Sequence, residues 1–357
     1  MQARFICLLA GFSSAATCAV AGGVERGPNS VAILFEEGNY AEVTLGYGSP
    51  DVSGTAFGGA SGNMLGSYLT YSLGIKQSLS DKLDFAIIMN EPIGADVDYA
   101  AGTGYALAGT TANLQAAAIT GLLRYKMPSN ISVYGGLRAE QAKGDVTIIA
   151  PLVGIPFYNL ATDRQMAWGY LVGAAWEKPE IAARVALTYV SPITHTLQSV
   201  ENGNPTGSFE TEVPQSLNLE FQTGIAADTL LFGSVRWQDW SAFDISPAAY
   251  TFLVGSPLVS YQSDRISYSL GIGRKFSDTW SGAVTLGYEP SNGDVTGNLG
   301  PVDGYKSIGL AASYTHDNIK ITGGVSYYKV GDAVTNIGAS FTDNSAVAAG
   351  VRVGVSF

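Results

Sequence analysis

The stretch VAAGVRVGVSF, from Val347 to Phe357, decides the fold of this chain of 357 residues. Successive side chains of a β-strand point to opposite faces. The apolar face carries Val351, Val353, Val355 and Phe357, and the other face carries Gly350, Arg352, Gly354 and Ser356. A bare apolar strand leaves an unpaired edge, which a closed barrel removes by pairing its last strand with its first. We therefore expect a barrel; an ordinary final strand of a soluble sheet is the alternative.

The composition suits one membrane-spanning β-domain. Charged residues make up 14% of the chain, which contains 44 glycines and 19 tyrosines. Strands with one face on lipid and aromatic girdles at the interfaces have this composition. No charge run, Pro-rich spacer or low-complexity tract marks a linker, so we predict a single barrel over residues 40–357. The net charge of −11 argues against a nucleic-acid partner.

Residues 1–21 have the features of a secretory signal peptide. Arg4 supplies the positive charge, residues 5–16 form a short apolar core, and residues 19–21 (AVA) form a small-x-small cleavage site. Both cysteines, Cys7 and Cys18, lie inside this segment. Lipidation at Cys18 is the alternative, although the preceding residues do not match a lipobox. Beyond this segment no apolar run reaches the ~20 residues that a transmembrane helix needs.

Short and long connections alternate along the chain. Tight turns are expected near residues 80–81, 128–130, 178–179, 227–228, 277–278 and 316–317. Longer polar or irregular stretches are expected at residues 49–66, 95–113, 148–165, 197–213, 241–262, 289–304 and 331–345. Six short and seven long connections join about fourteen strands into an all-β, antiparallel transmembrane barrel. An even strand number with both termini on the short-turn side is typical of bacterial outer-membrane barrels.

Individual segments support this interpretation. In residues 69–76, the side chains of Leu69, Tyr71, Leu73 and Ile75 are expected to face lipid. A β-sandwich shows the same alternation with its apolar face inward, so the signal peptide, the final strand and the connection lengths together favour a barrel. Aromatic residues near strand ends fit interfacial belts; they are Trp176, Trp237, Trp240, Trp280 and Tyr288.

Four motifs in the second half of the chain follow one another in a familiar order. They are EKP at 177–179 with Arg184, LTY at 187–189, Ser191 and His195; VPQS at 213–216; VRWQDWSAF at 235–243; and DRI at 264–266 through Gly271 with Trp280. In these motifs the chain resembles the FadL-type family of outer-membrane transporters (OMPP1/FadL/TodX), which carry long-chain fatty acids and other hydrophobic compounds. The resemblance covers roughly residues 165–357 well and the first half loosely.

The resemblance implies a monomeric barrel closed by an N-terminal hatch, with substrate released sideways beside a kinked third strand. Here the hatch-like segment, residues 22–39, is short. It contains Pro28-Asn29-Ser30, whereas the family usually has Asn-Pro-Ala near the end of its hatch. Either this segment still blocks the lumen, or the barrel is more open than its relatives.

Two long connections are unusually apolar for exposed loops, and we predict that they capture a hydrophobic substrate. The expected contact residues are Ile149, Leu152, Val153, Ile155, Phe157, Tyr158, Tyr250, Phe252 and Leu253. Such a site gives a hydrophobic molecule an apolar landing place above the polar outer surface. The alternative is that these loops pack against one another as a small core that caps the barrel.

Pro92 and Gly94 interrupt the alternation of the third strand. Proline cannot donate a ladder hydrogen bond and glycine weakens a strand, so we expect pairing to be broken there. The resemblance implies that a lateral exit lies at this position. Alternatively, the two residues simply end the strand at a loop.

Several charged side chains are expected to face the lumen. Any of Arg138, Arg184 and Arg236 is a candidate to bind the carboxylate of a fatty acid, because guanidinium groups pair with carboxylates bidentately. Pairing with luminal acids is the alternative; those acids are Glu42, Asp84, Glu140 and Glu220, and the other luminal cations are Lys76 and Arg352.

The sequence gives little support for an enzyme. The sequence has two histidines, His195 and His316, and no GxSxG, HExxH or P-loop pattern. We expect no catalytic residue, no cofactor and no metal site.

The leading hypothesis is passive uptake of long-chain fatty acids or other hydrophobic compounds across the outer membrane of a Gram-negative cell. We expect membrane lipid around the barrel, and recognition of the final strand, with its terminal Phe357, by barrel-assembly machinery. A general diffusion porin for polar solutes and an adhesin-like surface barrel are the alternatives.

Overall fold

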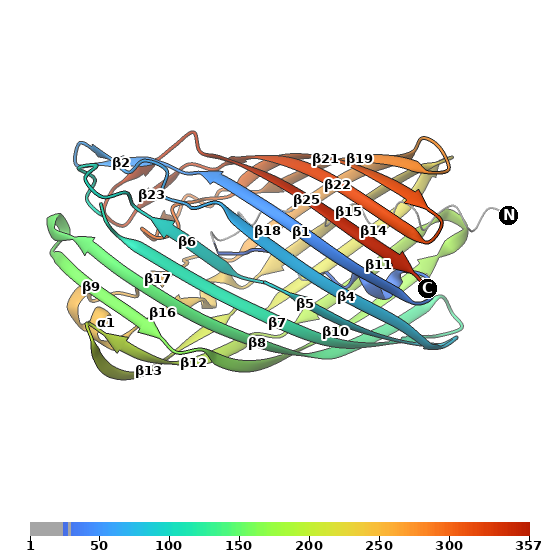
Figure 1. Cartoon of the computed structure of the whole chain (residues 1–357), viewed down its shortest axis with the longest axis horizontal. Coiled ribbons are helices and arrows are strands. Elements are labelled where there is room, and N and C mark those ends of the chain that lie inside the picture. Colours follow the sequence, from blue (N-terminus) through green and yellow to red (C-terminus); the bar gives the residue numbers. More distant parts are fainter. Residues whose placement is uncertain (1–23, 28–29) are drawn as a thin grey trace.

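The computed structural model describes residues 24–27 and 30–357, and its main feature is a closed barrel of 14 antiparallel strands (Figure 1). The first wall strand, β1 (Tyr40–Asp51), pairs with the last, β25 (Ser345–Ser356), and this pairing closes the wall. The remaining wall strands are β4 (Tyr68–Ser80), β5 (Leu83–Asn90) continued by β6 (Gly94–Asp98), β7 (Thr111–Lys126), β8 (Ile131–Ala150), β10 (Gln165–Lys178), β11 (Ala183–Val190), β14 (Ser216–Ala226), β15 (Thr229–Gln238), β18 (Arg265–Lys275), β19 (Trp280–Glu289), β21 (Tyr305–His316) and β22 (Ile319–Val330). The predicted fold and strand number are confirmed.

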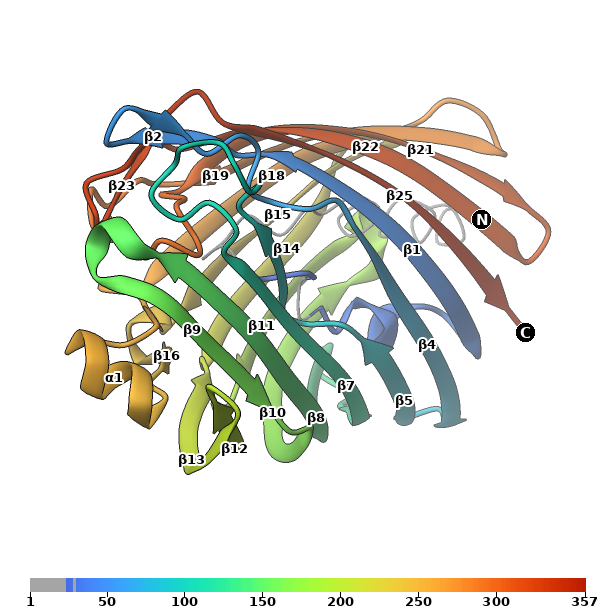
Figure 2. The ribbon, with the colours of Figure 1, turned by 60° about the vertical axis from the view of Figure 1, so that its left-hand side comes forward.

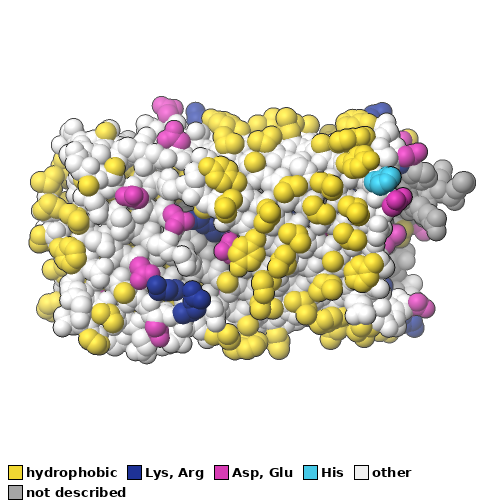
Figure 3. Space-filling view, in the orientation of Figure 1, with side chains coloured by type: hydrophobic (Ala, Val, Ile, Leu, Met, Phe, Trp, Pro, Cys, Tyr) yellow, Lys and Arg dark blue, Asp and Glu magenta, His cyan; other side chains and the backbone are white. Residues whose placement is uncertain are grey.

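The wall strands carry their apolar side chains outward. On the pair that closes the barrel, Leu45 lies opposite Val351, and the two side chains are 53% and 39% exposed. On the other face of the same pair, Arg352 is buried against Thr44. In Figure 3 the hydrophobic side chains form a band over the half of the wall nearer the chain termini; the opposite half carries scattered charged side chains, and hydrophobic side chains gather again at its far end. Contact with lipid requires an apolar band of this kind.

Short turns and long loops alternate as predicted. The short connections join β4 to β5, β7 to β8, β10 to β11, β14 to β15, β18 to β19 and β21 to β22. Asp228 and Asp317 occupy left-handed backbone conformations in two of these turns, with φ of 57° and 52°; aspartate tolerates this conformation because its short side chain bonds to the local backbone. We call the short-turn end periplasmic and the long-loop end extracellular, as in bacterial barrels.

The long connections build structure of their own at the extracellular end (Figure 2). A small five-stranded sheet contains β2 (Gly54–Ala56), β3 (Gly59–Ala60), β20 (Val295–Thr296), β23 (Ala333–Thr335) and β24 (Ser340–Phe341). The other extracellular elements are β9 (Ile155–Thr162), β12 (Ile193–Glu201), β13 (Asn204–Val213), β16 (Asp244–Ile245), β17 (Val259–Ser260), the helix α1 (Ala248–Val254) and the 3-10 helices η6 (Pro151–Val153) and η8 (Trp240–Ala242). At the periplasmic end, η7 (Pro179–Ile181) joins β10 to β11.

Residues 24–27 and 30–39, the described residues before β1, lie inside the barrel, and we call them the luminal segment. It contains the 3-10 helix η5 (Ala32–Phe35). Leu34 of η5 is fully buried in an apolar cluster that includes Leu122, Tyr134 and Leu171 of the wall. Glu25 forms an isolated β-bridge with Ile93, between β5 and β6. The luminal segment therefore contacts the wall at two separated places.

The aromatic belt is formed in part as expected. Trp176, Trp280 and Tyr288 are 42%, 51% and 45% exposed on the wall. The expectation for Trp240 is wrong, because η8 turns the chain inward after β15 and leaves this side chain 1% exposed. Its ring packs 5.5 Å from that of Phe243.

Residues 1–23 and 28–29, which include the predicted signal peptide and part of the predicted hatch, lie outside the described residues. Within the described ranges, no helix has both the length and the apolar character needed to cross a membrane.

Candidate functional site

All seven long connections contribute to one buried apolar cluster at the extracellular end, which we call the loop cap. Tyr99 and Tyr105 stack within it, with ring centres 5.1 Å apart. Tyr158 of β9 and Tyr250 of α1 meet edge to face, with ring centres 5.0 Å apart. The loop cap joins segments far apart in the sequence, so the loops form a packed layer over the barrel.

Glu201 fixes α1 to the loop cap. Its carboxylate accepts a hydrogen bond from the Tyr158 hydroxyl at 2.7 Å and from the backbone amides of Ala249 and Tyr250 at 3.1 and 2.9 Å. Burial by itself raises the pKa of Glu201, but hydrogen bonds from Thr206, Tyr158 and the two amides outweigh burial and lower its pKa below the ordinary value of 4.5. The carboxylate is therefore charged at neutral pH and holds the first turn of α1 in place.

The structure divides the predicted capture residues. Four of the nine are exposed, namely Phe252 at 95%, Leu152 at 66%, Phe157 at 56% and Leu253 at 53%. Ile149 and Val153 are half-buried. The other three, Ile155, Tyr158 and Tyr250, belong to the loop cap and are buried.

These three are not the exposed side chains that the sequence led us to expect, because their connections fold back and pack together. The alternative of a core between loops therefore describes Ile155, Tyr158 and Tyr250. The exposed set lies on the outside of that core, where Phe252 and Leu253 occupy α1 and Leu152 occupies η6.

The third wall strand is broken at the position where Pro92 and Gly94 stand. β5 pairs with β4 as far as Asn90, which lies opposite Ser72, and the strand resumes as β6 at Gly94. Between them the chain bonds to the luminal segment: the amide of Arg26 donates to the carbonyl of Pro92 at 3.0 Å. The strand is interrupted and then continues, so Pro92 and Gly94 do not end it.

A pocket of about 440 Å³ lies at this break, and we call it the wall pocket. Its lining from β4, β7 and β8 includes Tyr68, Leu69, Tyr71, Gln115, Ala117 and Gln141. Arg26 reaches it from inside the barrel; its guanidinium lies 3.5 Å from the centre of the Tyr68 ring and 2.7 Å from the Asp96 carboxylate. The wall pocket is therefore lined both by outward-facing wall residues and by the luminal segment.

The three predicted luminal arginines all have partners within the barrel. Arg138 is 4% exposed, with Nη2 3.0 Å from Oε2 of Glu140. Arg236 bonds to Glu25 of the luminal segment. The guanidinium of Arg184 lies 4.4 Å from the centre of the Phe35 ring.

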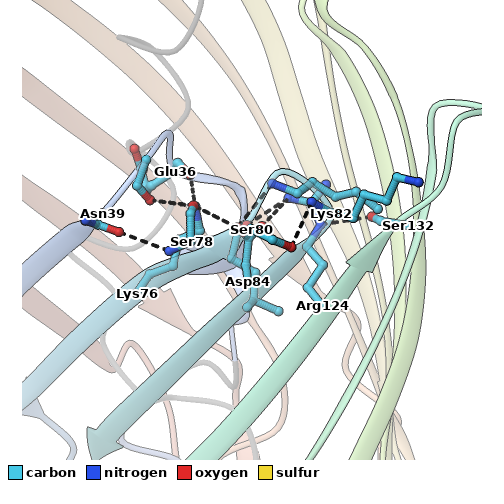
Figure 4. A network of polar contacts seen from close by, with 12 residues as sticks. Glu36, Asn39, Lys76, Ser78, Ser80, Lys82, Asp84, Arg124 and Ser132 are labelled. Atoms are coloured by element: carbon cyan, nitrogen blue, oxygen red, sulfur yellow. Dashed lines mark hydrogen bonds and ion pairs between the residues drawn. The ribbon is translucent and has the colours of Figure 1, made fainter.

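A cluster of charges holds the luminal segment at the periplasmic end (Figure 4). Asp84 is fully buried, and its carboxylate lies 3.6 Å from the ammonium of Lys76, 3.1 Å from that of Lys126 and 3.9 Å from the guanidinium of Arg124. Arg124 also bonds to Glu177. We call these five residues the periplasmic latch.

The latch contacts the backbone of the luminal segment. Lys76 donates to the carbonyl groups of Glu36 and Gly38, each at 2.8 Å, and Arg124 donates to the carbonyl of Leu34 at 2.8 Å. Hydrogen bonds from charged donors are the stronger kind, so these bonds anchor the segment.

Sequence reasoning missed Glu25 and Arg26, the two luminal-segment residues at the wall pocket. The signal available was an adjacent pair of opposite charges in the short stretch GGVERG, residues 22–27. It cannot be interpreted from sequence, because the partners Arg236 and Asp96 lie 211 and 70 residues away.

A closed 14-strand barrel with an outward apolar band, a chain segment inside its lumen and a break in its wall defines an outer-membrane barrel of the transport class. The chain matches the family model described as outer membrane protein transport protein (OMPP1/FadL/TodX) over residues 52–293, and it belongs to this family. The family consists of transport proteins and is not one of enzymes.

Solved structures share the fold at low sequence identity. A FadL homologue of Pseudomonas aeruginosa is similar with a TM-score of 0.74 and 14% identity, over 92% of this chain and 93% of that one. The Pseudomonas putida toluene transporter TodX gives a TM-score of 0.66 and 13% identity over 98% and 97% of the two chains. The Ralstonia pickettii toluene transporter TbuX gives 0.63 and 14% over 98% and 97%. No curated protein sequence matches significantly.

Proposed function

We propose that this barrel carries hydrophobic small molecules passively across the outer membrane, capturing them on its loops and releasing them sideways through the wall pocket. One observation carries the proposal: the wall is interrupted beside a chain segment that occupies the lumen, with an apolar cap on one side and a charged latch on the other. Related barrels of the same fold include toluene transporters.

Capture falls to the exposed apolar side chains outside the loop cap. Phe252, Leu253, Leu152 and Phe157 present apolar surface to solvent. Burying each side chain of this size against a ligand contributes about 1.5–3 kcal/mol. The buried tyrosines beneath them hold α1 in position and are supporting residues in this scheme.

Passage straight through the periplasmic end is disfavoured for an apolar molecule. It would have to separate Asp84 from the three cations around it and expose the carbonyl groups bonded by Lys76 and Arg124. Each buried polar group left without its partner costs about 1–3 kcal/mol, and more when it is charged. A hydrophobic molecule has no charged or hydrogen-bonding groups that could replace those bonds.

The wall pocket offers a route of lower resistance. On the extracellular side of the Ser72–Asn90 pair, residues 68–71 of β4 have no ladder partner in the third wall strand. A molecule can pass there without breaking the sheet. The side chain of Arg26 is the element that must move, because it lies over Tyr68 at the pocket. Pro92 and Gly94 keep the break in place in this scheme.

Fatty acids and neutral hydrocarbons are the two candidate substrate classes, and the ion pairs in the lumen favour neutral hydrocarbons. Long-chain fatty acids carry a carboxylate, which would have to replace Glu140 at Arg138 or Glu25 at Arg236. Aromatic or aliphatic hydrocarbons need no luminal ion pair to be broken.

The two alternative functions are disfavoured. A general diffusion porin is disfavoured by the luminal segment and its latch, and an adhesin by the packed loop cap. We further propose that the barrel works as a monomer and that its final strand is recognised by the barrel-assembly machinery.

Uptake and conductance together test this function. Cells with and without the protein are given a panel of long-chain fatty acids and aromatic hydrocarbons, and the purified protein is inserted into a planar bilayer. Faster uptake of a hydrophobic compound with negligible steady conductance supports the proposal. Large steady conductance without such uptake would establish a porin instead.

A further inference from the structure

Two lysines stand directly opposite each other on the outer wall. Lys306 of β21 is the ladder partner of Lys329 of β22, and both side chains are exposed. Directly opposite residues on one face of an antiparallel pair have Cβ atoms about 4.5–5.5 Å apart, and like charges in that arrangement destabilise the pair. The repulsion is relieved when an anion lies between the two ammonium groups.

The protein itself supplies no such anion. Among residues 24–27 and 30–357, neither ammonium group has an ion-pair or hydrogen-bond partner. A partly exposed lysine of the wall is different: Lys143 of β8 forms an ion pair with Asp145 at 2.8 Å. The chain carries 30 acidic residues and 19 basic ones. The lysine pair therefore lacks an acidic partner because of where it lies on the wall, and not because acidic residues are scarce.

The lysine pair lies at the extracellular edge of the apolar band. Below it on the same face, Ile308 pairs with Tyr327 and Leu310 pairs with Val325. These four side chains are 48%, 50%, 56% and 47% exposed, as lipid-facing residues are. A lipid whose acyl chains lie along this apolar ladder therefore places its headgroup at the two ammonium groups.

Tyrosines flank the pair. Tyr288 of β19 is the ladder partner of Lys306 on its other side and is 45% exposed, and its ring stacks on that of Tyr268 with centres 6.4 Å apart. Tyrosine at a membrane interface combines an apolar ring with a hydroxyl group that bonds to headgroups. The surface thus offers cations, hydroxyl groups and aromatic faces to one polar headgroup.

We infer that Lys306 and Lys329 bind the phosphorylated sugar headgroup of a glycolipid in the outer leaflet of the outer membrane. Phosphate groups of such lipids are normally bridged by divalent cations, and two ammonium groups a few ångströms apart supply the same charge. Basic residues at a membrane surface each contribute about 1 kcal/mol to the attraction of an anionic headgroup, so loss of both weakens binding about thirtyfold. This lipid site is separate from the wall pocket and does not depend on the proposed transport.

The test counts lipid molecules that stay bound. The full barrel is purified from outer membranes in mild detergent and washed with EDTA, which removes lipid held through divalent cations. Native mass spectrometry then counts the phosphorylated glycolipid on the wild type, on K306Q/K329Q and on K306R/K329R. The matched control is K178Q/R274Q, which removes two exposed cations from the periplasmic end of the wall. Heat-dependent gel migration checks that every variant is folded.

Retention of about one glycolipid by the wild type, the arginine variant and the control, with an approximately thirtyfold loss in K306Q/K329Q, is the expected result. Titration of lipid-free barrel with the glycolipid, its dephosphorylated form and inorganic phosphate identifies the ligand; only the first should bind tightly. Equal retention by K306Q/K329Q, equal binding of the dephosphorylated lipid, or loss of a co-purifying protein in place of lipid would overturn the assignment.

Discussion

The two ends of this barrel are built from opposite chemistry. At the extracellular end, the loop cap packs apolar side chains such as Tyr158, Tyr250 and Phe341. At the periplasmic end, the latch surrounds a fully buried Asp84 with cations and anchors the luminal segment by its backbone. In the proposed function, this difference explains why an apolar molecule captured at the extracellular end would leave through the wall and would not pass the periplasmic end.

The largest expected effect comes from breaking the latch. Asp84→Asn leaves Lys76, Lys126 and Arg124 without their shared carboxylate. Removing one partner of a buried ionic cluster typically lowers the free energy of unfolding by about 3–5 kcal/mol. Equilibrium unfolding of the reconstituted barrel in urea measures this loss.

The matched control is Asp278→Asn, because Asp278 is also paired with a lysine, Lys275, but is exposed. Exposed ion pairs contribute about 0–1 kcal/mol, so this variant should unfold close to the wild type. Equal destabilisation by the two substitutions would mean that the latch is not a buried anchor.

Filling the wall pocket should slow uptake while leaving both ends of the barrel intact. Ala117 of β7 lines the wall pocket and is exposed on its outer side, so Ala117→Trp should obstruct the opening. If the indole ring raises the barrier to passage by about 1.4 kcal/mol, the uptake rate falls about tenfold. Radiolabelled hydrocarbon uptake by whole cells measures it, with Ala174→Trp, at an exposed lipid-facing site of β10, as the control. Unchanged uptake in Ala117→Trp would show that substrate leaves elsewhere.

The sequence predicts the barrel well because its determinants are local. The alternation of side chains along a strand, as in residues 347–357, can be recognised without knowing which strand pairs with it. The lengths of the connections can be recognised in the same way, and together they predict the fourteen strands and six tight turns. The pairing of inward charges is different. Glu25 meets Arg236 across 211 residues only after the barrel closes, and no local pattern records that register.

The sequence also does not predict which apolar side chains of the loops are exposed and which are buried. Phe252 and Tyr250 are two positions apart on α1, yet one is 95% exposed and the other 8%. The apolar composition of the loop fits either an exposed capture site or a core between loops, and it does not say which side chains belong to each. Which is which depends on the contact of Tyr250 with Tyr158 from another loop.

At the extracellular end, removing exposed apolar side chains should weaken capture. F252S/L253S removes two of them, and the concentration of substrate for half-maximal uptake should rise about fivefold, since partial burial of each contributes a fraction of its 1.5–3 kcal/mol. The matched control is Phe276→Ser, which removes a 69% exposed phenylalanine near the periplasmic turn. If both variants behave alike, capture is not localised at α1.

The smallest expected effect is a pH dependence of the loop cap. The pKa of Glu201 is lowered in the folded protein, so its stabilising bonds are complete above the unfolded value of 4.5 and are lost as the pH falls through the lower folded value. Amide hydrogen exchange of Ala249 and Tyr250, corrected for intrinsic rate, should therefore show weaker protection below about pH 4 than at pH 6. Glu201→Gln should show no such change, and a pH dependence that persists in that variant would point to another group.

The route of release is tested most directly by mapping where a hydrophobic molecule contacts the barrel. A photoreactive hydrocarbon is added to cells that carry the protein, and labelled residues are identified by mass spectrometry. Lateral release predicts labels on Leu69, Tyr71 and Ala117 at the wall pocket. Labels on Met127 and Lys126, which line the space beneath the luminal segment at the periplasmic end, would contradict it.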